Sequence, residues 1–536
     1  MTDLLAWVTV AAYAVTLGLL LPFAGHRLHL WRLSRRPNPI QRRKWSGPLP
    51  AVTVQLPVYN ERHVVERLID AACALDYPDD LLEIQLLDDS DDETSSLAAS
   101  RIAHWRSRGR DVRHLRRTER EGYKAGALAA GLRSARGEFL LIFDADFVPG
   151  PGVVRDLLPS FSNPAVGMAQ ARWDHLNEGQ SWLTRAQAVL LDGHFAFEQG
   201  GRFRGGRFFN FNGTAGMWRR AALVDAGGWH FDTLTEDLDV SYRAQLEGWR
   251  FVYRDDVGVP AELPASLEAF LTQQRRWAQG GIQTARKVLP AVLRSSAPDA
   301  AKWEAFVHLC GHLAHPLTLL LGLLVLPAAL ARRRVGLDAF WWVDLLLFVM
   351  ATGPFVWFYV QAARTRRRPA PVKRALETIA LGVGLSLFLT RSVLRGLRST
   401  RDPFRRTPKR GVAILETSLW PGPRTAVDPG YERTGWTAAA AAGVALGGAL
   451  AAETVFALTS GLWASAPFIG LFSFGFLRLG SAGLVSSGLP PEPEGGPREE
   501  SPWRNPHDSG SPPGLWPGSR GQIVAQSPIA EEYEPA

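Results

Sequence analysis

Cysteine is scarce in this chain, which has only Cys73 and Cys310 among its 536 residues. One lies in a polar region and the other in an apolar one, so the sequence argues against a disulfide framework. The chain also lacks an excess of acids, because Lys and Arg number 60 and Asp and Glu number 52. A basic excess can indicate nucleic acid, but here the arginine clusters flank long apolar runs, as is typical of membrane topology. We therefore expect a lipid bilayer as a partner, and no nucleic acid.

The first apolar run, Leu4–Ala24, contains no charged residue. A helix rising ~1.5 Å per residue would cross about 30 Å over this run, which is the thickness of a hydrocarbon core. A signal peptide would need basic residues before its apolar stretch, whereas here the basic residues follow it. The pattern predicts a transmembrane anchor over residues 1–26 and a basic juxtamembrane linker over 27–50, with the cytoplasm on the C-terminal side.

The polar middle of the chain, residues 51–290, has the pattern of an α/β domain. Four short apolar runs are expected to be strands: Val52–Leu56, Ile84–Leu87, Phe139–Phe143 and Val166–Ala171. Amphipathic stretches such as Glu61–Leu75 and Tyr123–Ala135 lie between them. This alternation predicts a largely parallel sheet with helices on both faces. Such sheets bind ligands at the carboxyl ends of their strands, where polar residues follow here.

Four later apolar runs are long enough to span a bilayer: Leu309–Leu330, Phe340–Ala363, Thr437–Ser460 and Ala464–Val485. The run Ile379–Leu389 is shorter and leads into arginines, so we expect an interfacial helix there and five spans in total. The expected segments are a linker and two spans (291–363), the interfacial helix with a gating-like loop (364–436), two spans (437–485) and a disordered tail rich in Pro, Gly, Ser and Glu (486–536).

Paired acids follow the third expected strand. Asp144 and Asp146 could together grip Mg²⁺ or Mn²⁺ and the oxygens of a diphosphate, although a lone pair of this kind is usually a solvated turn. Two further acidic clusters, Asp88–Asp92 and Thr235–Asp237, strengthen the ligand interpretation. The second cluster has a simpler alternative, in which Thr235 caps a helix and the acids favour its N-terminal dipole.

A basic and aromatic motif, Gln273–Trp277, lies on an expected helix. The planar fork of Arg276 suits a diphosphate, and the flat face of Trp277 suits a sugar ring. Taken alone, the motif is more typical of an ordinary amphipathic helix.

The order of these motifs resembles that of processive inverting glycosyltransferases of family 2, such as cellulose synthase catalytic subunits and hyaluronan synthases. The matching series is Val54–Glu61, Asp88-Asp89, Asp144-Ala145-Asp146, Thr235–Asp237 and Gln273–Trp277. Finer matches resemble the plant cellulose-synthase-like mannan and glucan synthases: Asp88–Asp92, Ala169–Trp173, Phe211–Gly216 and Gly227–Trp229. The segment Phe404–Lys409 resembles the gating loop of cellulose synthases, with Arg406 where valine is usual.

The resemblance implies a GT-A-type nucleotide-sugar-binding α/β domain inserted between transmembrane helices, and it implies roles for the matching residues. The implied roles are nucleotide-sugar binding by Tyr59, Glu61, Asp89, Lys124 and Asp144; metal binding by Asp144 and Asp146; catalysis by Asp237 as general base, with Glu236 beside it; diphosphate and acceptor binding by Gln273, Arg276 and Trp277; and gating by Phe404, Thr407 and Lys409.

The resemblance further implies a reaction. A hexose would pass from GDP-mannose or UDP-glucose to a growing β-linked mannan, glucomannan or glucan, at the cytoplasmic face of the plasma (inner) membrane. One alternative is a single transfer to a lipid acceptor, as in ceramide glucosyltransferases. Another is an inactive membrane scaffold or export channel, which the intact acidic motifs disfavour.

Overall fold

The structure is a computed structural model that describes residues 2–39, 45–398, 407, 411 and 436–487. Its polar part contains a seven-stranded sheet in the order β3-β2-β1-β4-β6-β5-β7. β1 to β4 are parallel to their neighbours in this group, β6 is antiparallel to β4 and β5, and β7 is parallel to β5. The strands are β1 Val52–Val58, β2 Leu82–Asp88, β3 Val112–Arg116, β4 Phe139–Ile142, β5 Val166–His175, β6 Gly216–Arg219 and β7 Arg250–Ala261.

The four expected strands are present as β1, β2, β4 and β5. The sequence did not indicate β3, β6 and β7, because each carries charged residues within its span. β3 reads Val-Arg-His-Leu-Arg, and the middle of β7 holds Asp255 and Asp256. Pairing with neighbouring strands therefore outweighs the weak local signal of these three segments.

Helices of the α/β domain cover both faces of the sheet, as predicted. In β4, Leu141 packs with residues of α2, α3 and α5 in one core cluster. Its neighbours Leu140 and Ile142 pack with residues of α4, α8 and α9 in another. Successive side chains of a strand point to opposite faces, which explains this split. The helices are α2 Val65–Cys73, α3 Thr94–Arg106, α4 Tyr123–Ser134, α5 Val153–Leu157, α8 Arg220–Asp225 and α9 Glu236–Leu246, with short 3₁₀ turns η1 Asp79–Leu81, η2 Leu158–Ser162 and η3 Glu178–Gln180.

A second group of helices connects the sheet domain to the apolar part of the chain. A continuous helical stretch runs through α6, η4 and α7, and α10 and α11 follow β7. The bounds are α6 Trp182–Gly193, η4 His194–Gln199, α7 Gly200–Arg204, α10 Leu267–Arg294, α11 Asp299–Leu309, η5 Gly311–Leu313 and η6 Asp338–Phe340.

Within the described residues, six helices are long and apolar enough to cross a membrane, judged by length and composition. Such helices are typical of an integral membrane protein. They are α1 Asp3–Ser34, α12 Ala314–Arg334, α13 Trp341–Thr365, α14 Pro371–Arg398, α15 Trp436–Thr459 and α16 Ala466–Ser487. The five expected spans coincide with all of these except α14.

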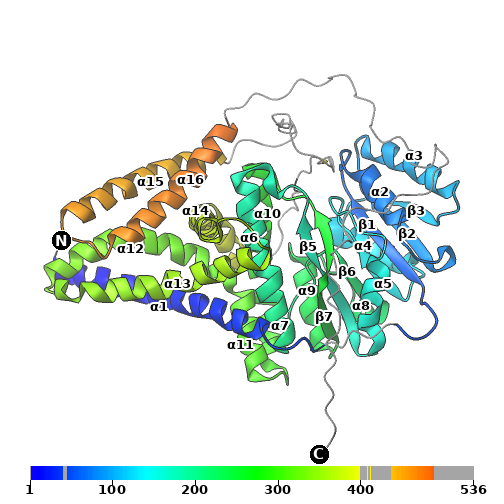
Figure 1. The fold of residues 1–536 in the computed structure, drawn as a ribbon, viewed down its shortest axis with the longest axis horizontal. Helices are drawn as coiled ribbons and strands as arrows, with labels where there is room; N and C mark the ends of the chain where they lie inside the picture. Colours follow the sequence, from blue (N-terminus) through cyan, green and yellow to red (C-terminus); the bar gives the residue numbers. More distant parts are fainter. Residues whose placement is uncertain (1, 40–44, 399–406, 408–410, 412–435, 488–536) are drawn as a thin grey trace, which may run out of the picture. The chain divides into compact units, whose positions relative to one another are not determined.

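The helix α14 differs from the short segment that the sequence suggested, because it extends well beyond Ile379–Leu389 at both ends. It packs against α6, α10, α12, α13 and α16, and most residues of its apolar stretch are buried. Figure 1 shows α14 nearly along its axis, whereas α1, α12, α13, α15 and α16 run across the view. A helix that lies crosswise to the other five fits the interfacial placement, which stays a prediction.

The basic linker expected over residues 27–50 is also partly wrong. The helix α1 continues through Ser34, so residues 27–34 are helical. The physical reason is a buried ion cluster formed by His26, Arg202 and Glu304, which joins α1 to α7 and α11. Glu304 accepts hydrogen bonds from His26 Nε2 at 2.9 Å and from Arg202 Nε at 2.8 Å. These contacts hold the end of α1 against the α/β domain.

Two other expectations lie largely outside the described residues. They are the disordered tail, of which only 486 and 487 are described, within α16, and the gating-like loop, of which Thr407 is described. Phe404 and Lys409 both lie outside the described part of the chain.

Candidate active site

One cavity lies at the carboxyl ends of β1, β2 and β4, and it encloses about 1270 Å³ including its mouth. The sequence predicted a set of site residues, and every one of them that lies in the described part of the chain lines this cavity. They are Tyr59, Glu61, Asp89, Lys124, Asp144, Asp146, Glu236, Asp237, Gln273, Arg276, Trp277 and Thr407. Their individual roles stay predictions.

The acidic cluster after β2 is held by the protein's own donors. Asp88 is fully buried and accepts hydrogen bonds from His114, Ser95 and the backbone of Ser90. Burial alone would raise the pKa of Asp88, but these hydrogen bonds together lower it to about 2. Asp89 forms a two-point ion pair with Arg117, at 2.9 and 2.5 Å. The repulsion expected among these acids is therefore already balanced without a metal ion.

The paired acids after β4 stand directly at the exit of an entirely buried apolar strand. Asp144 forms an ion pair with Lys124, and its backbone N–H donates to Thr214 Oγ1 at 2.9 Å. Lys124 also donates to the Gly213 carbonyl at 3.0 Å and lies 4.0 Å from Glu236. Burial alone would lower the pKa of Lys124, but the charges of Asp144 and Glu236 raise it. Lys124 thus links the acids after β4 to those at the start of α9.

The expected base, Asp237, lies in the first turn of α9. Burial raises its pKa well above the ordinary value, the neighbouring Glu236 adds to this, and the positive charges of Lys124 and Arg276 oppose it. The simpler explanation of this motif is wrong in one respect, because Thr235 makes no side-chain cap of the helix. Its hydroxyl instead lies 3.0 Å from the hydroxyl of Thr284 on α10.

Gly213 lets the backbone approach the expected base closely. Its φ is +79°, a left-handed conformation that glycine adopts without strain. A Cβ at this position would meet Asp237 Oδ2 at 2.9 Å and Lys124 Nζ at 3.5 Å. Both the conformation and the contact therefore require glycine at this edge of the cavity.

The helix α10 supplies Gln273, Arg276 and Trp277 to the opposite side of the cavity. Positions i, i+3 and i+4 share one face of a helix, which explains why these three side chains line it together. The Ser266 hydroxyl accepts a hydrogen bond from the Ala269 N–H at 3.2 Å and so fixes the start of the helix. The expected basic and aromatic motif is thus a cavity-facing stripe of α10.

Thr407, the described member of the gating-like loop, is buried and lines the same cavity. Its hydroxyl has no hydrogen-bond partner among the residues that the structure describes. Burying a hydroxyl without a hydrogen-bond partner costs free energy, so a ligand that hydrogen-bonds to this hydroxyl would bind more tightly.

The acids Asp144 and Asp146 suit a hard divalent cation. Carboxylate oxygens are ligands that Mg²⁺ and Mn²⁺ prefer, and Mg²⁺ commonly uses one or two carboxylates together with substrate phosphates and water. Both acids line the cavity, and Asp146 is 3% exposed. The two carboxylates therefore fit a metal ion whose remaining ligands are diphosphate oxygens and water.

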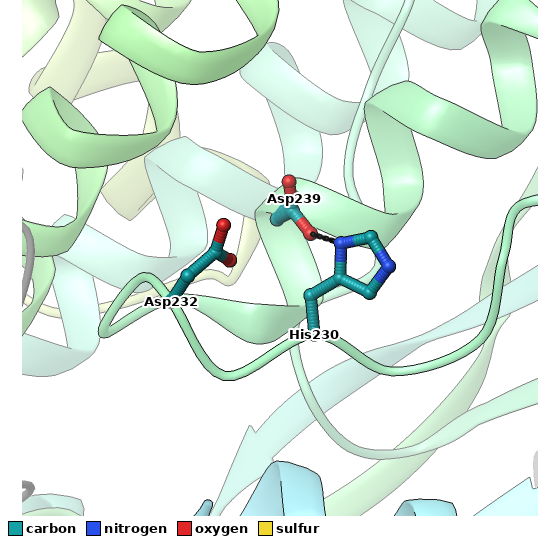
Figure 2. Close-up of side chains that lie close together, drawn as sticks. All are labelled: His230, Asp232 and Asp239. Carbon is teal, nitrogen blue, oxygen red and sulfur yellow. Dashed lines mark ion pairs between the residues drawn. The ribbon is translucent and has the colours of Figure 1, made fainter.

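A different cluster, His230, Asp232 and Asp239, also brings three potential metal ligands within 4.8 Å of one another (Figure 2). The ammonium of Lys287 already lies 2.6 Å from Asp232 Oδ1, 3.1 Å from Asp239 Oδ1 and 3.0 Å from His230 Nδ1. Arg243 pairs with Asp239 as well, at 2.8 Å. The positive charges of Arg243 and Lys287 balance the two acids, so this cluster is an ion-pair network rather than a metal centre.

Several further side chains line the cavity without a role expected from the sequence, among them Arg120, His175, Asn212 and Glu262. Arg120 belongs to an arginine-rich stretch after β3 whose spacing carries no motif. Asn212 lies within a segment that matched a family pattern, which was the available signal for it. His175 is the last residue of β5 and Glu262 follows β7, and strand ends are the general signal for such positions.

The fold and the cavity define a class of protein. Residues 50–280 match the protein-family model described as "Glycosyltransferase like family 2". The similarity to this family covers the α/β domain, whose acids lie at the carboxyl edge of the sheet. The expected fold class, a GT-A-type α/β domain placed between apolar helices, is confirmed.

More particular similarities concern the mannan synthases. The chain is 44% identical over 255 residues to glucomannan 4-beta-mannosyltransferase 2 of Arabidopsis thaliana, covering 47% of this chain and 48% of that protein. It is 38% identical over 320 residues to glucomannan 4-beta-mannosyltransferase 7 of the same plant, covering 58% of each. The chain thus spans about half the length of the relatives it matches. Among solved structures, mannosyltransferase PcManGT from Pyrobaculum calidifontis, in complex with GDP-Man and Mn²⁺, aligns with a TM-score of 0.47 at 21% identity, over 74% of this chain and 99% of that chain.

Proposed function

We propose that this protein is an inverting membrane glycosyltransferase that transfers a hexose from a nucleotide sugar to a growing β-linked polysaccharide. The observation that carries the proposal is the convergence of Asp144, Asp146, Asp237 and Arg276 on one cavity. Those residues come from three separate parts of the chain, the segment after β4, α9 and α10, and match the roles that this chemistry needs. The mannosyltransferase relatives favour mannose as the sugar and a mannan or glucomannan as the product, with UDP-glucose as the alternative donor.

In the proposed mechanism, Asp237 takes the proton of the acceptor hydroxyl as that oxygen attacks the anomeric carbon. A general base works best when its pKa lies near the operating pH, and burial together with Glu236 moves the pKa of Asp237 in that direction. Gly213 has no Cβ and so leaves room for the Asp237 carboxylate beside the backbone. The attack comes from the face opposite the diphosphate, which inverts the anomeric configuration.

The leaving diphosphate needs its growing negative charge stabilised. Mg²⁺ or Mn²⁺ bound by Asp144 and Asp146 would supply Lewis-acid stabilisation of that charge. Arg276 can add a two-point contact to the diphosphate oxygens, since its guanidinium is planar and always charged. Lys124 positions Asp144 through their ion pair. A second acid is not required, because a diphosphate is already a good leaving group.

The segment around Thr407 would close over the bound nucleotide. The buried Thr407 hydroxyl is available to a diphosphate oxygen. Closure would exclude water and so protect the donor from hydrolysis. Phe404 and Lys409 keep the gating roles that the family resemblance implies.

We further propose that the protein is integral to the plasma (inner) membrane with its catalytic domain in the cytoplasm. The support is the distribution of arginine, which is dense in Arg364–Arg368 and in residues 398–410. Protease accessibility of a tag inserted in the α/β domain, measured in sealed vesicles of either orientation, tests this topology.

The function itself is tested by a donor screen on the full chain in detergent or nanodiscs. Radiolabelled GDP-mannose, UDP-glucose and other nucleotide sugars are supplied singly, and the product is analysed for length and linkage. The proposal expects long β-linked chains from one of the two donors. A product limited to one sugar on a lipid would support the single-transfer alternative. If no donor gave either a transfer product or free sugar, the protein would not be an active glycosyltransferase.

A further inference from the structure

Two arginines on the loop between β3 and α4 differ sharply in their surroundings. Arg117 pairs with both oxygens of Asp89 and also donates to the backbone carbonyls of Glu121 and Tyr123, at 2.8 and 3.0 Å. The side chain of Arg120 has no hydrogen bond or ion pair with any residue that the structure describes, although its backbone carbonyl accepts from the Tyr123 N–H at 3.2 Å. Its Nε atom is buried and without a hydrogen-bond partner. A guanidinium has five N–H donors, and leaving a buried one such as Nε without a partner is costly.

Aromatic rings hold the Arg120 guanidinium in place. Its central carbon lies 3.2 Å from the centre of the Tyr59 ring and 4.9 Å from that of Tyr123. A cation–π contact uses the face of the guanidinium, whereas its N–H groups lie in its plane and point outward from its edge. The stack therefore fixes the plane of Arg120 and leaves its donors available at the edge. Because Arg120 lines the cavity, a bound ligand can reach those donors.

The charges around Arg120 argue against a phosphate as that ligand. The negative charges that act on Arg120 are those of Asp89 and Asp91, beside Tyr59. Those acting on Lys124 are Asp144, Glu236 and Asp237, at the end of the cavity proposed to hold the diphosphate. The proposed cation at Asp144 and Asp146 would offset the acids at that end, whereas a phosphate beside Arg120 would meet the charge of Asp91 with no cation proposed there to offset it. A neutral, planar group with hydrogen-bond acceptors on its edge would not be repelled, and a nucleobase is such a group.

Base chemistry then discriminates between the two candidate donors. Guanine presents two adjacent acceptors, O6 and N7, whose spacing matches two N–H groups of arginine. Uracil presents its carbonyl oxygens on either side of an N–H donor, so an arginine can pair with one oxygen at a time. We propose that Arg120 recognises the base of the donor by hydrogen bonds to the O6 and N7 edge and so selects guanine over uracil. This proposal rests on the proposed nucleotide-sugar transfer.

The test measures nucleotide binding rather than transfer, on the full chain in detergent with Mn²⁺ present. Isothermal titration compares GDP, UDP, inosine diphosphate and a GDP analogue in which carbon replaces N7. We expect the wild-type protein to bind GDP about 5- to 150-fold more tightly than UDP and more tightly than the N7 analogue, since a two-point base contact discriminates by that much. Inosine diphosphate keeps O6 and N7 and loses the 2-amino group, so its affinity should stay near that of GDP.

Variants separate base recognition from packing. Arg120→Lys keeps the positive charge but loses the fork, so GDP and the N7 analogue should bind it equally while UDP affinity changes less than about threefold. Arg108 stacks on Trp105 at 5.8 Å and does not line the cavity, so Arg108→Ala is the matched control and should bind all four nucleotides as the wild type does.

Three results would overturn the proposal. One is an equal preference for GDP and its N7 analogue in the wild type, and a second is a preference for UDP. The third is a parallel loss of GDP and UDP affinity in Arg120→Lys, which would make Arg120 a packing residue only. The wild-type comparison of GDP with its N7 analogue stands even if Arg120→Lys does not fold. Failure of the proposed function is distinct from all three, because a protein that is no nucleotide-sugar transferase would bind none of these diphosphates.

Discussion

In the buried ion cluster, Glu304 is 1% exposed and accepts hydrogen bonds from both His26 and Arg202. In the cavity, Arg120 and Thr407 carry polar atoms that are equally shielded from water but have no partner among the described residues. Burial alone would raise the pKa of Glu304, yet the hydrogen bond from His26 and the charge of Arg202 lower it. In the cavity the balance at Asp237 goes the other way, and its pKa rises. The carboxylate of Glu304 thus has its partners within the protein, whereas the Nε of Arg120 and the hydroxyl of Thr407 line a cavity in which a ligand can supply the missing partner.

The largest expected effect comes from removing the metal ion. If a cation completes the site at Asp144 and Asp146, excess EDTA should abolish transfer, and added Mg²⁺ or Mn²⁺ should restore it. The measurement is sugar incorporation with a labelled nucleotide sugar. Asp232→Asn in the His230 cluster serves as a control, because Lys287 already occupies that cluster, and its metal dependence should match the wild type. Full activity in chelator would remove the metal from the mechanism.

A nearly as large effect is expected from Asp237→Asn. Loss of a general base typically lowers turnover about 10²- to 10⁴-fold, whereas donor affinity should change little. An acid whose pKa is raised on folding costs stability at neutral pH, so the amide variant should melt no lower than the wild type. The wild-type rate should fall as the pH drops through this raised pKa. Glu247→Gln, at the exposed far end of α9, is the control. Turnover of Asp237→Asn at the wild-type rate would refute the assignment.

Breaking the paired region should instead affect folding. Glu304→Gln removes the nearer of two acids that pair with the buried Arg202, the other being Glu198 at 3.8 Å, and breaking a buried ion pair typically costs about 3–5 kcal/mol. The lowered pKa of Glu304 implies that its stabilisation is present above its unfolded pKa and is lost as the pH falls through its folded value. Unfolding in detergent, followed at several pH values, measures both effects. The exposed pair Arg62–Glu93 offers a contrast, since Glu93→Gln should cost less than about 1 kcal/mol. Equal losses in the two variants would contradict the comparison.

The smallest effect is expected at Thr407. A single hydrogen bond is worth roughly 0.5–1.5 kcal/mol, so Thr407→Ala should slow synthesis by up to about tenfold. Thr407→Ser keeps the hydroxyl and should retain most of the rate. Synthesis is compared at matched amounts of protein in the membrane. A patch that merely binds anionic lipid would depend on summed charge. In that case Thr407→Ala would be silent, and the gating proposal would fail.

Local sequence determined a large part of this protein. The buried apolar run of β4 and the acids that follow it were visible in the sequence, because a strand with no polar residue must be covered on both faces. The five long apolar runs were visible for a similar reason, since only a helix can satisfy its backbone in such surroundings. The spacing of Gln273, Arg276 and Trp277 already placed them on one helical face.

Tertiary structure decided the remainder. β3 and β7 carry charged residues that hide their strand character, and only pairing with neighbouring strands reveals it. The length and crosswise course of α14 depend on the helices around it. Arg117 and Arg120 are both arginines and stand three positions apart. No local pattern could therefore tell which side chain pairs with Asp89 and which one stacks on aromatic rings. That difference arises from long-range contacts with the ends of β1 and β2, and sequence proximity carries no information about such contacts.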